Sequence, residues 1–215
     1  MKTKVKIKRL TMDIDTKRLN KVLKNRTKFI NPREFEKSPL IDTIQRAGVL
    51  IVLLPTLEDK YGYSILFNQR SDHVPNHKGQ IAFPGGGYKD EDLTLLNTAI
   101  RETFEESGLK IRIQDILGEM DDFLTISDFL VTPFIGLGPS KPRTLRPDGW
   151  EIIESFEVPL SVLMDEKNSE IKQKEYLGKV YDVHYYYYND RIIWGVTGEI
   201  LYHFLKILKE EVYQH

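Results

Sequence analysis

The chain has 215 residues, of which 40% are hydrophobic and 29% are charged, and its formal net charge at pH 7 is -1. This length suits one domain with a sizeable core, and the near-zero charge argues against a nucleic-acid or membrane partner. The absence of cysteine excludes disulfides, thiolate nucleophiles and zinc–thiolate sites. No apolar run approaches the roughly 20 residues of a membrane span, and the start lacks the apolar core of a secretory signal, so we expect a cytoplasmic protein.

The first part of the chain, residues 1–40, is rich in Lys and Arg and is predicted to be a basic N-terminal extension, with residues 41–215 as the main domain. Residues 15–26 predict a short helix, because Asp15 suits the N-cap and a narrow apolar face follows at Leu19, Val22 and Leu23. The basic residues could meet a negatively charged ligand. We favour the simpler interpretation, a solvated extension packed on the core.

Short apolar runs predict strands along the rest of the chain. The run at 47–55, rich in Val, Ile and Leu, is typical of a buried strand, and 63–70 is expected to pair back on it. The elements predicted after these are strands within 79–83, 109–120 and 129–138, a loop at 140–151, a hairpin at 181–195 turning at Asn189-Asp190, and an amphipathic helix at 198–212. Strands mixed with a central and a terminal helix indicate an α/β sandwich.

Four consecutive tyrosines, residues 185–188, fall in the predicted hairpin. Because side chains alternate along a strand, we expect two of them to pack inward and two to face outward. Stacking on nucleic-acid bases is the alternative, which the absence of a basic surround disfavours.

A central helix is predicted at 92–107, within the stretch AFPGGGYKDEDLTLLNTAIRETFEESGL. Acidic residues at its start suit the positive end of the helix dipole, namely Asp90, Glu91 and Asp92. Gly108 is suited to end the helix. A buried stripe is expected where apolar residues recur at spacings of three and four, at Leu93, Leu96, Ile100 and Phe104.

Three glutamates, Glu102, Glu105 and Glu106, project from one side of this helix, within a sector of about 100°. Like charges at this spacing repel each other, so the group suggests a positive partner. A solvated acidic patch paired with Arg101 is the structural alternative. The preceding FPGGG favours a site, because glycines let the backbone approach a metal ion or a phosphate. Carboxylate oxygens suit Mg²⁺ or Mn²⁺, so the residues indicate metal-assisted phosphoryl chemistry.

The segment RETFEESGL, residues 101–109, resembles the core of the Nudix box. This resemblance implies a Nudix-type α/β/α sandwich with a mixed β-sheet and a central catalytic helix. It also implies hydrolysis of a nucleoside diphosphate linked to another group. Two positions depart from the pattern. Thr103 stands where the family prefers an aliphatic residue, and Leu93 takes the place of the first glutamate of the box, with Asp92 one step off register.

A narrower resemblance joins residues 65–86, ILFNQRSDHVPNHKGQIAFPGG, to the signature that precedes the box in coenzyme A pyrophosphatases. Later landmarks of that subfamily are similar to VTPFIG at 131–136, FEVPL at 156–160 and WGVTGEI at 194–200. The resemblance implies cleavage of coenzyme A or its derivatives to 3′,5′-ADP and 4′-phosphopantetheine. Pro75 departs from the signature, which carries an Arg there. The alternative substrate is therefore ADP-ribose, a nucleotide sugar or another nucleoside diphosphate derivative.

The family resemblance also implies roles for individual residues. Glu102, Glu105 and Glu106 would hold Mg²⁺ or Mn²⁺ together with a main-chain carbonyl of Gly85 or Gly86. Arg101 would hold a glutamate in its working rotamer. The water's proton is expected to go to Glu105 or Glu106, ahead of the later candidates Glu119, Asp121 and Glu151.

Contacts with the substrate, a small-molecule nucleoside diphosphate, are expected at Arg70, His77, Gly86 and Gly87. By analogy with the family, a homodimer is possible, through the basic extension or the hairpin at 181–194. The alternative of another class is a catalytically inactive Nudix-fold nucleotide-binding protein. Retention of all three helix glutamates argues against that alternative.

Overall fold

The computed structural model describes residues 14–26, 30–31, 44–73, 78–125, 127–176 and 178–213. Its helices are α1 (Thr16–Asn25), α2 (Leu95–Ser107), α3 (Leu160–Leu163) and α4 (Gly195–Ile207), and a wider helical turn (Leu208–Val212) continues α4. Its strands are β1 (Ile30–Asn31), β2 (Gln45–Pro55), β3 (Tyr63–Arg70), β4 (Ile81–Ala82), β5 (Gly85–Gly87), β6 (Ile116–Glu119), β7 (Asp122–Leu124), β8 (Phe129–Leu137), β9 (Ile152–Pro159), β10 (Ser169–Tyr176), β11 (Lys179–Tyr188) and β12 (Arg191–Ile193). Among the described helices, none combines the length and apolar character that a membrane crossing requires.

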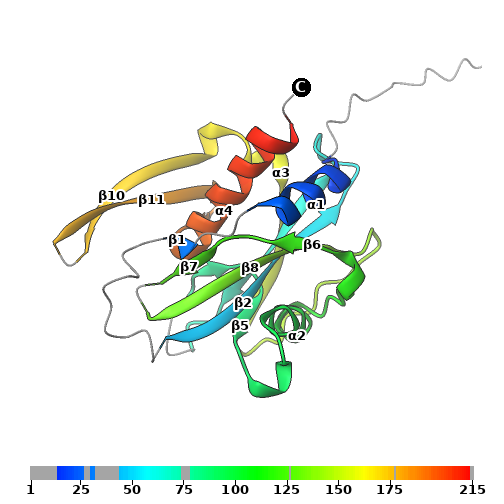
Figure 1. Cartoon of the computed structure of the whole chain (residues 1–215), viewed down its shortest axis with the longest axis horizontal. Coiled ribbons are helices and arrows are strands. Elements are labelled where there is room, and N and C mark those ends of the chain that lie inside the picture. The colour runs from blue at the N-terminus through cyan, green and yellow to red at the C-terminus, as the bar shows by residue number, and fades with distance from the viewer. Residues whose placement is uncertain are drawn as a thin grey trace, which may run out of the picture.

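The larger sheet is mixed and follows the order β1-β7-β8-β2-β3-β4, with β5 on β2, β6 on β8 and β9 on β3. Strands β2 and β8 run parallel at its centre, whereas β2 and β3 are antiparallel. Strands β10, β11 and β12 form a second, antiparallel sheet. The ribbon of β10 and β11 projects from the body of the molecule (Figure 1).

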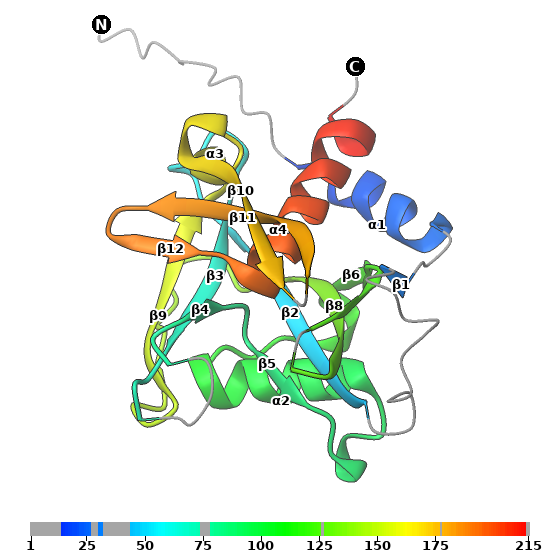
Figure 2. The ribbon, with the colours of Figure 1, turned by 90° about the vertical axis from the view of Figure 1, so that its left-hand side faces the viewer.

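The larger sheet is covered on both faces, which explains why β2 is apolar along nearly its whole length. Leu50, Val52 and Leu54 pack with Ala99 of α2 in one apolar cluster. The alternate residues Ile51 and Leu53 join the cluster to which α1 and α4 contribute. Figure 2 shows the result, with α2 on one side of the sheet and α1 and α4 on the other. The predicted α/β sandwich with a mixed sheet is confirmed.

Several local predictions are confirmed and others need correction. Strand 63–70 coincides with β3, and the hairpin turns at Asn189, whose φ is 53°, between the paired residues Tyr188 and Arg191. The strand predicted at 109–120 is shorter, because a tight turn at Ile113–Asp115 precedes β6. Strand β10 was not predicted. Its residues, SEIKQKEY, are mostly polar or charged and none is buried, so its pairing with β11 left no hydrophobic signal.

The tyrosine run alternates as predicted. Tyr186 and Tyr188 belong to the main core. On the other face, Tyr185 stacks with Trp194 at 5.9 Å between ring centroids, and Tyr187 donates a hydrogen bond to Glu170. The ring of Tyr185 is itself covered rather than solvated, since only 8% of the residue is exposed.

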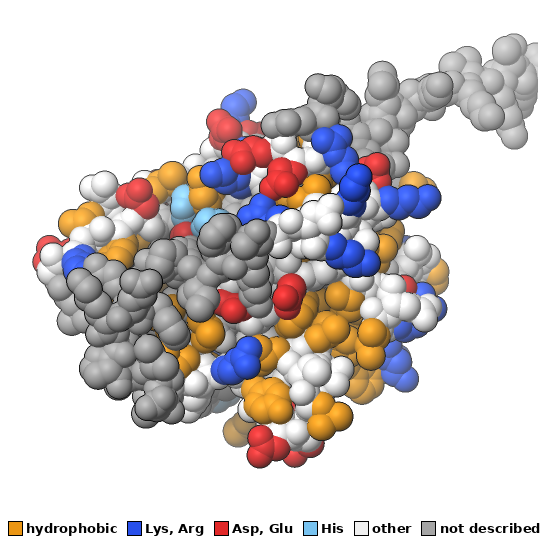
Figure 3. All heavy atoms as spheres, viewed as in Figure 1, with side chains coloured by type: hydrophobic (Ala, Val, Ile, Leu, Met, Phe, Trp, Pro, Cys, Tyr) orange, Lys and Arg blue, Asp and Glu red, His pale blue; other side chains and the backbone are white. Residues whose placement is uncertain are grey.

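Helix α1 lies within the predicted basic extension and packs on the core. Its N-cap is Asp15, whose Oδ1 accepts hydrogen bonds from the backbone N–H groups of Lys17 and Arg18, each at 3.0 Å. Leu19 and Leu23 are buried against the sheet face opposite α2. Basic side chains gather over the outer surface of α1, as Figure 3 shows. The domain boundary predicted at residues 40–41 lies outside the described residues.

Helix α2 begins three residues later than predicted, and its predicted buried stripe is wrong at Leu93 and Phe104, whereas Leu96 packs, partly buried, against the cluster of Leu50, Val52 and Leu54. Leu93 precedes the helix and is 79% exposed, and Phe104 is 46% exposed. The buried face consists instead of small or polar residues, at Thr98, Ala99, Thr103, Glu106 and Ser107. Their hydroxyls are satisfied locally, since Thr103 Oγ1 donates to the carbonyl of Ala99 at 2.7 Å. The sequence does carry a pattern that indicates this face, because small residues recur at a spacing of four, at 99, 103 and 107.

The reason for this small-residue face is the closeness of β2 to the helix. A Cβ added to Gly48 would lie 2.2 Å from the carbonyl oxygen of Leu95. We therefore expect Gly48→Ala to cost about 3 kcal/mol of unfolding free energy, measured by urea denaturation, because the clash is with backbone. Gly87→Ala is the matched control in the paired strand, where a Cβ would meet only Phe129 at 3.9 Å. Equal losses in the two variants would contradict this explanation.

Candidate functional site

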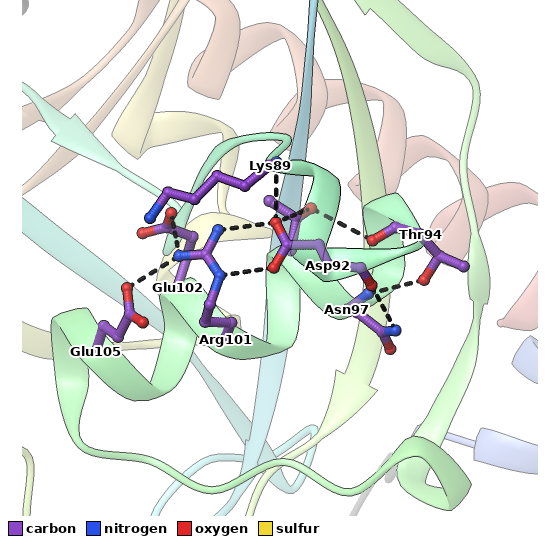
Figure 4. Close-up of polar contacts among 8 residues, drawn as sticks. Lys89, Asp92, Thr94, Asn97, Arg101, Glu102 and Glu105 are labelled. Carbon is purple, nitrogen blue, oxygen red and sulfur yellow. Dashed lines mark hydrogen bonds and ion pairs between the residues drawn. The ribbon is translucent and has the colours of Figure 1, made fainter.

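Arg101, in the middle of α2, bonds to three carboxylates, one before the helix and two on it (Figure 4). Its Nε donates to Asp92 Oδ1 at 2.7 Å, and its Nη2 donates to Asp92 Oδ2 at 2.9 Å. Its Nη1 donates to Glu102 at 2.6 Å and to Glu105 at 2.9 Å. One guanidinium therefore orients two of the three helix glutamates while a buried aspartate holds it from the other side.

Asp92 supplies the carboxylate that contacts Arg101, although Leu93 takes the place of the first glutamate of the box. Only 5% of the residue is exposed, and its Oδ2 also accepts hydrogen bonds from Thr98 Oγ1 at 2.8 Å and from the backbone N–H of Lys89 at 3.1 Å. The bonds from Arg101 hold the pKa of Asp92 well below its usual range, although burial opposes this. The pKa of Arg101 is raised in turn, above all by Asp92.

Asp92 stands one residue before the position expected for the first glutamate of the box. The backbone conformation of Leu93 accommodates this offset. That residue has a φ of 63°, a left-handed conformation uncommon for leucine, and its side chain points to solvent. Thr94 then caps α2 by accepting a hydrogen bond from the backbone N–H of Asn97 at 3.1 Å. The extra residue thus loops out, and an acidic side chain still reaches Arg101.

Glu106 is the buried glutamate of α2, with 5% of the residue exposed. Its Oε2 accepts hydrogen bonds from the Asn68 amide at 3.0 Å and from the backbone N–H of Gly85 at 3.1 Å. Burial raises the pKa of Glu106 to about 8, the Gly85 hydrogen bond opposes that rise, and the charges of Glu102 and Glu151 add to it. A carboxylate at this position is therefore short of positive charge.

The glycines of β5 bring backbone against the two inner glutamates. Gly85 pairs with Val49 of β2, and a Cβ on Gly85 would lie 2.5 Å from the carbonyl oxygen of Gly48. A Cβ on Gly86 would lie 2.7 Å from Glu102 Oε1. Gly87 has open space where its Cβ would be, with only Phe129 within 4 Å. Main-chain atoms and carboxylates therefore converge at Gly85 and Gly86, as the glycine motif predicts.

Arg70 faces Glu106 across a small cavity of about 100 Å³. Its Nη2 lies 2.7 Å from Glu151 Oε1, while its buried Nε has no hydrogen-bond partner among the residues that the structure describes. Asn68, Arg70, Gly85, Glu106 and Thr197 form the polar part of the cavity lining. Phe83 and apolar residues of β2, β4, β8, β9 and α4 form the rest. Such a cavity suits a ligand with an anionic group beside an apolar one.

The structure brings half of the sequence-predicted site residues to this cavity or its rim: Arg70, Gly85, Gly86, Glu102, Glu106 and Glu151. Glu105 stands further out, with 51% of its side chain exposed. Asp121 is engaged with Arg26 at 3.4 Å, and Glu119 lies in the ladder between β6 and β8. His77 and Pro75 lie outside the described residues.

No three acidic or histidine side chains form a ready-made metal cluster in the described part of the chain. Glu102 and Glu105 are instead turned toward Arg101. Two residues of the site were missed by sequence reasoning. Asn68 reaches Glu106 and accepts a hydrogen bond from Ser155 at 2.7 Å, and Asp92 holds Arg101. The sequence did not mark Asn68 as a site residue, because it stands within an apolar strand. Its side-chain partner, Glu106 of α2, is distant in the sequence.

Comparison with known proteins identifies the family. Residues 45–177 match the model of the NUDIX domain. A relative named "Uncharacterized Nudix hydrolase NudL", from Photorhabdus laumondii, is 30% identical over 182 residues, which span 81% of this chain and 92% of the relative. The relative of the same name from Yersinia pestis (strain Pestoides F) is 32% identical over 161 residues, or 75% of this chain and 78% of the relative.

A solved structure supports the fold. The crystal structure of a MutT/nudix family protein from Enterococcus faecalis superposes with a TM-score of 0.55 at 13% identity, covering 83% of this chain and 67% of that one. At this identity the similarity speaks for the fold alone. Taken with the domain match and the two relatives, it shows that the chain belongs to the NUDIX domain family and is a Nudix hydrolase.

Proposed function

We propose that this Nudix hydrolase cleaves the pyrophosphate bond of coenzyme A or its derivatives, giving 3′,5′-ADP and 4′-phosphopantetheine, with Mg²⁺ or Mn²⁺. The observation that carries the proposal is that one cavity holds both a buried carboxylate and a buried donor. Glu106 is a buried carboxylate short of positive charge, and Arg70 Nε is a buried donor without a partner among the described residues. A divalent cation with a bound diphosphate would satisfy both groups.

The donor set fits a hard divalent ion. Carboxylates of Glu102 and Glu106 lie beside the backbone of Gly85 and Gly86, so oxygen atoms are the available ligands. Glu105 would join them by releasing Arg101, to which it is bound at an exposed position. When bound, the ion would supply the Lewis acidity that activates water and offsets charge on the phosphate oxygens.

The chain's own groups supply the remaining steps. Arg101 holds Glu102 in one rotamer, because Asp92 fixes the guanidinium from the opposite side. Arg70 donates from its Nε, which has no hydrogen-bond partner in the described part of the chain, to a phosphate oxygen of the substrate and fixes its orientation. Glu106 or Glu105 accepts the proton of the attacking water.

Coenzyme A is favoured as substrate because Arg70 and FPGG, which carry the resemblance to the coenzyme A signature, meet at this cavity. The apolar part of the lining suits an uncharged arm next to the diphosphate. ADP-ribose, a nucleotide sugar or another nucleoside diphosphate derivative is the second candidate. A cytoplasmic location and a homodimer stay predictions from the sequence.

The test is product formation from coenzyme A with Mg²⁺ or Mn²⁺, for the wild type and Arg70→Gln. We expect the variant to lose about a hundredfold in kcat/KM, the loss associated with a charge-assisted bond to phosphate. Arg191→Gln is a matched control, since Arg191 Nε is also buried without a hydrogen-bond partner among the residues described. Arg191 also pairs with a glutamate, Glu154, at 2.8 Å and similar exposure.

Each outcome of this assay decides a different part of the proposal. If Arg191→Gln loses as much activity as Arg70→Gln, the effect is structural and Arg70 has no special role. Survival of coenzyme A together with cleavage of ADP-ribose or a nucleotide sugar would replace the substrate and keep the enzyme. Inertness on every diphosphate in both metals would favour a nucleotide-binding protein.

A further inference from the structure

Two aromatic rings stand exposed beyond the cavity. Trp150 is 73% exposed, and its ring lies 6.3 Å from that of His73, at an interplanar angle of 21°. Neither ring has a role in the site described above. A tryptophan so exposed costs solubility, and such rings concentrate at binding surfaces, where they give large contact area at little entropic cost.

Both rings are presented on ordered turns. The Asp148 carboxylate accepts hydrogen bonds through Oδ1 from three successive backbone N–H groups, those of Trp150 at 3.0 Å, Glu151 at 3.0 Å and Ile152 at 2.8 Å. On the facing turn, the N–H of His73 donates to Ser71 Oγ at 3.0 Å. The backbone that carries the indole is therefore ordered before any ligand arrives, which lowers the entropic cost of binding at this turn.

The two turns extend the strand pair that forms one wall of the cavity. Arg70 of β3 stands opposite Ile152 of β9, and both line the cavity with Glu106. The next step outward is a backbone hydrogen bond from Ser71 to the Glu151 carbonyl at 2.7 Å. Trp150 directly precedes Glu151 in the chain, so its Cα lies within about 7 Å of that of Ile152. The turns that carry the two rings therefore adjoin the end of the strand pair at which Arg70 would hold the diphosphate.

We propose that Trp150, backed by His73, is the stacking surface for the nucleobase of the substrate. The inference rests on the proposed function, since it places the nucleoside half of the same diphosphate. Every base offers a π face, so this contact tolerates any base and adds binding strength without reading base identity. Recognition of the other half of the substrate then falls to the remaining cavity lining.

The first test reads binding without turnover. The chain has two tryptophans, so Trp194→Phe leaves Trp150 as the sole indole. We expect saturable quenching of its fluorescence by AMP and none by ribose 5-phosphate, which carries the same phosphate without a base. Equal responses to both compounds, or no response to AMP, would overturn the stacking role. This readout stands even if coenzyme A is not the substrate.

The second test uses the diphosphate that the enzyme consumes. Trp150→Ala should raise KM about tenfold with kcat changed by less than about twofold, because stacking adds ground-state and transition-state binding equally. Trp150→Phe should keep most of the affinity, and Leu57→Ala, at another exposed apolar position, should change neither constant. An unchanged KM in Trp150→Ala, or a loss confined to kcat, would refute the proposal while leaving the hydrolase assignment intact.

Discussion

Replacing Glu106 by Gln is expected to lower kcat by at least about a hundredfold in saturating Mg²⁺ or Mn²⁺. Gln has the same shape and can still accept the hydrogen bonds from Asn68 and Gly85. It lacks the negative charge that a divalent cation requires and cannot act as a base. The measurement is steady-state hydrolysis of whichever diphosphate the wild type consumes, with Glu91→Gln as a control at an exposed position outside the site. Activity within about threefold of the wild type would refute the assigned role.

The same substitution should leave the metal-free protein at least as stable as the wild type. The pKa of Glu106 is raised from 4.5 to about 8 in the folded state, so between these values the folded chain binds more protons than the unfolded chain. Folding stability contributed by this group is therefore lost as the pH rises through that range. Gln does not titrate, so the variant escapes the loss.

This stability difference is measurable by urea denaturation with a chelator at pH 5 and pH 8. The unfolding free energy of Glu106→Gln relative to the wild type should increase by about 2 kcal/mol or more between the two pH values. A lower stability for the variant at pH 8 would mean that the burial of Glu106 serves the fold rather than a ligand. Loss of activity with retained stability separates a functional role from a structural one.

Replacing Asp92 by Asn is expected to cost about 3 kcal/mol of unfolding free energy. The Asp92 side chain is 2% exposed and that of Arg101 is 21% exposed, so the substitution leaves a partly buried guanidinium without its bidentate partner. Asn can accept only one of the two hydrogen bonds that Arg101 now donates to Asp92. Activity should fall as well, because Arg101 no longer holds Glu102 from a fixed position.

A second Asp–Arg pair provides the matched control. Arg112 donates two hydrogen bonds to Asp115 at 2.6 and 2.8 Å, but its side chain is 69% exposed. Water screens this pair, so Asp115→Asn should change the stability little or not at all. Comparable losses in both variants would show that burial is not what gives the Asp92 pair its strength.

Features that depend on residues close together in the chain were predictable from the sequence. The Asp15 cap of α1, the span of β3 and the turn at Asn189 all follow from periodicity and side-chain chemistry within a few residues. The three glutamates of α2 were placed on one side of the helix for the same reason, because helical spacing is a local property.

Only the tertiary structure decided which face of α2 is buried. The predicted apolar stripe fails at Leu93 and Phe104, and the fully buried positions of α2 are small or polar because β2 passes too close at Gly48 for large side chains. The burial of Glu106 likewise depends on Asn68 and Gly85, both far from α2 in the sequence. The approach of Trp150 to His73 depends on the pairing of β3 with β9. Such contacts join segments that are far apart in the sequence, so no local pattern predicts them. Sequence periodicity therefore determined the elements and the site residues along them. The packing of those elements determined which charges are buried and what they contact.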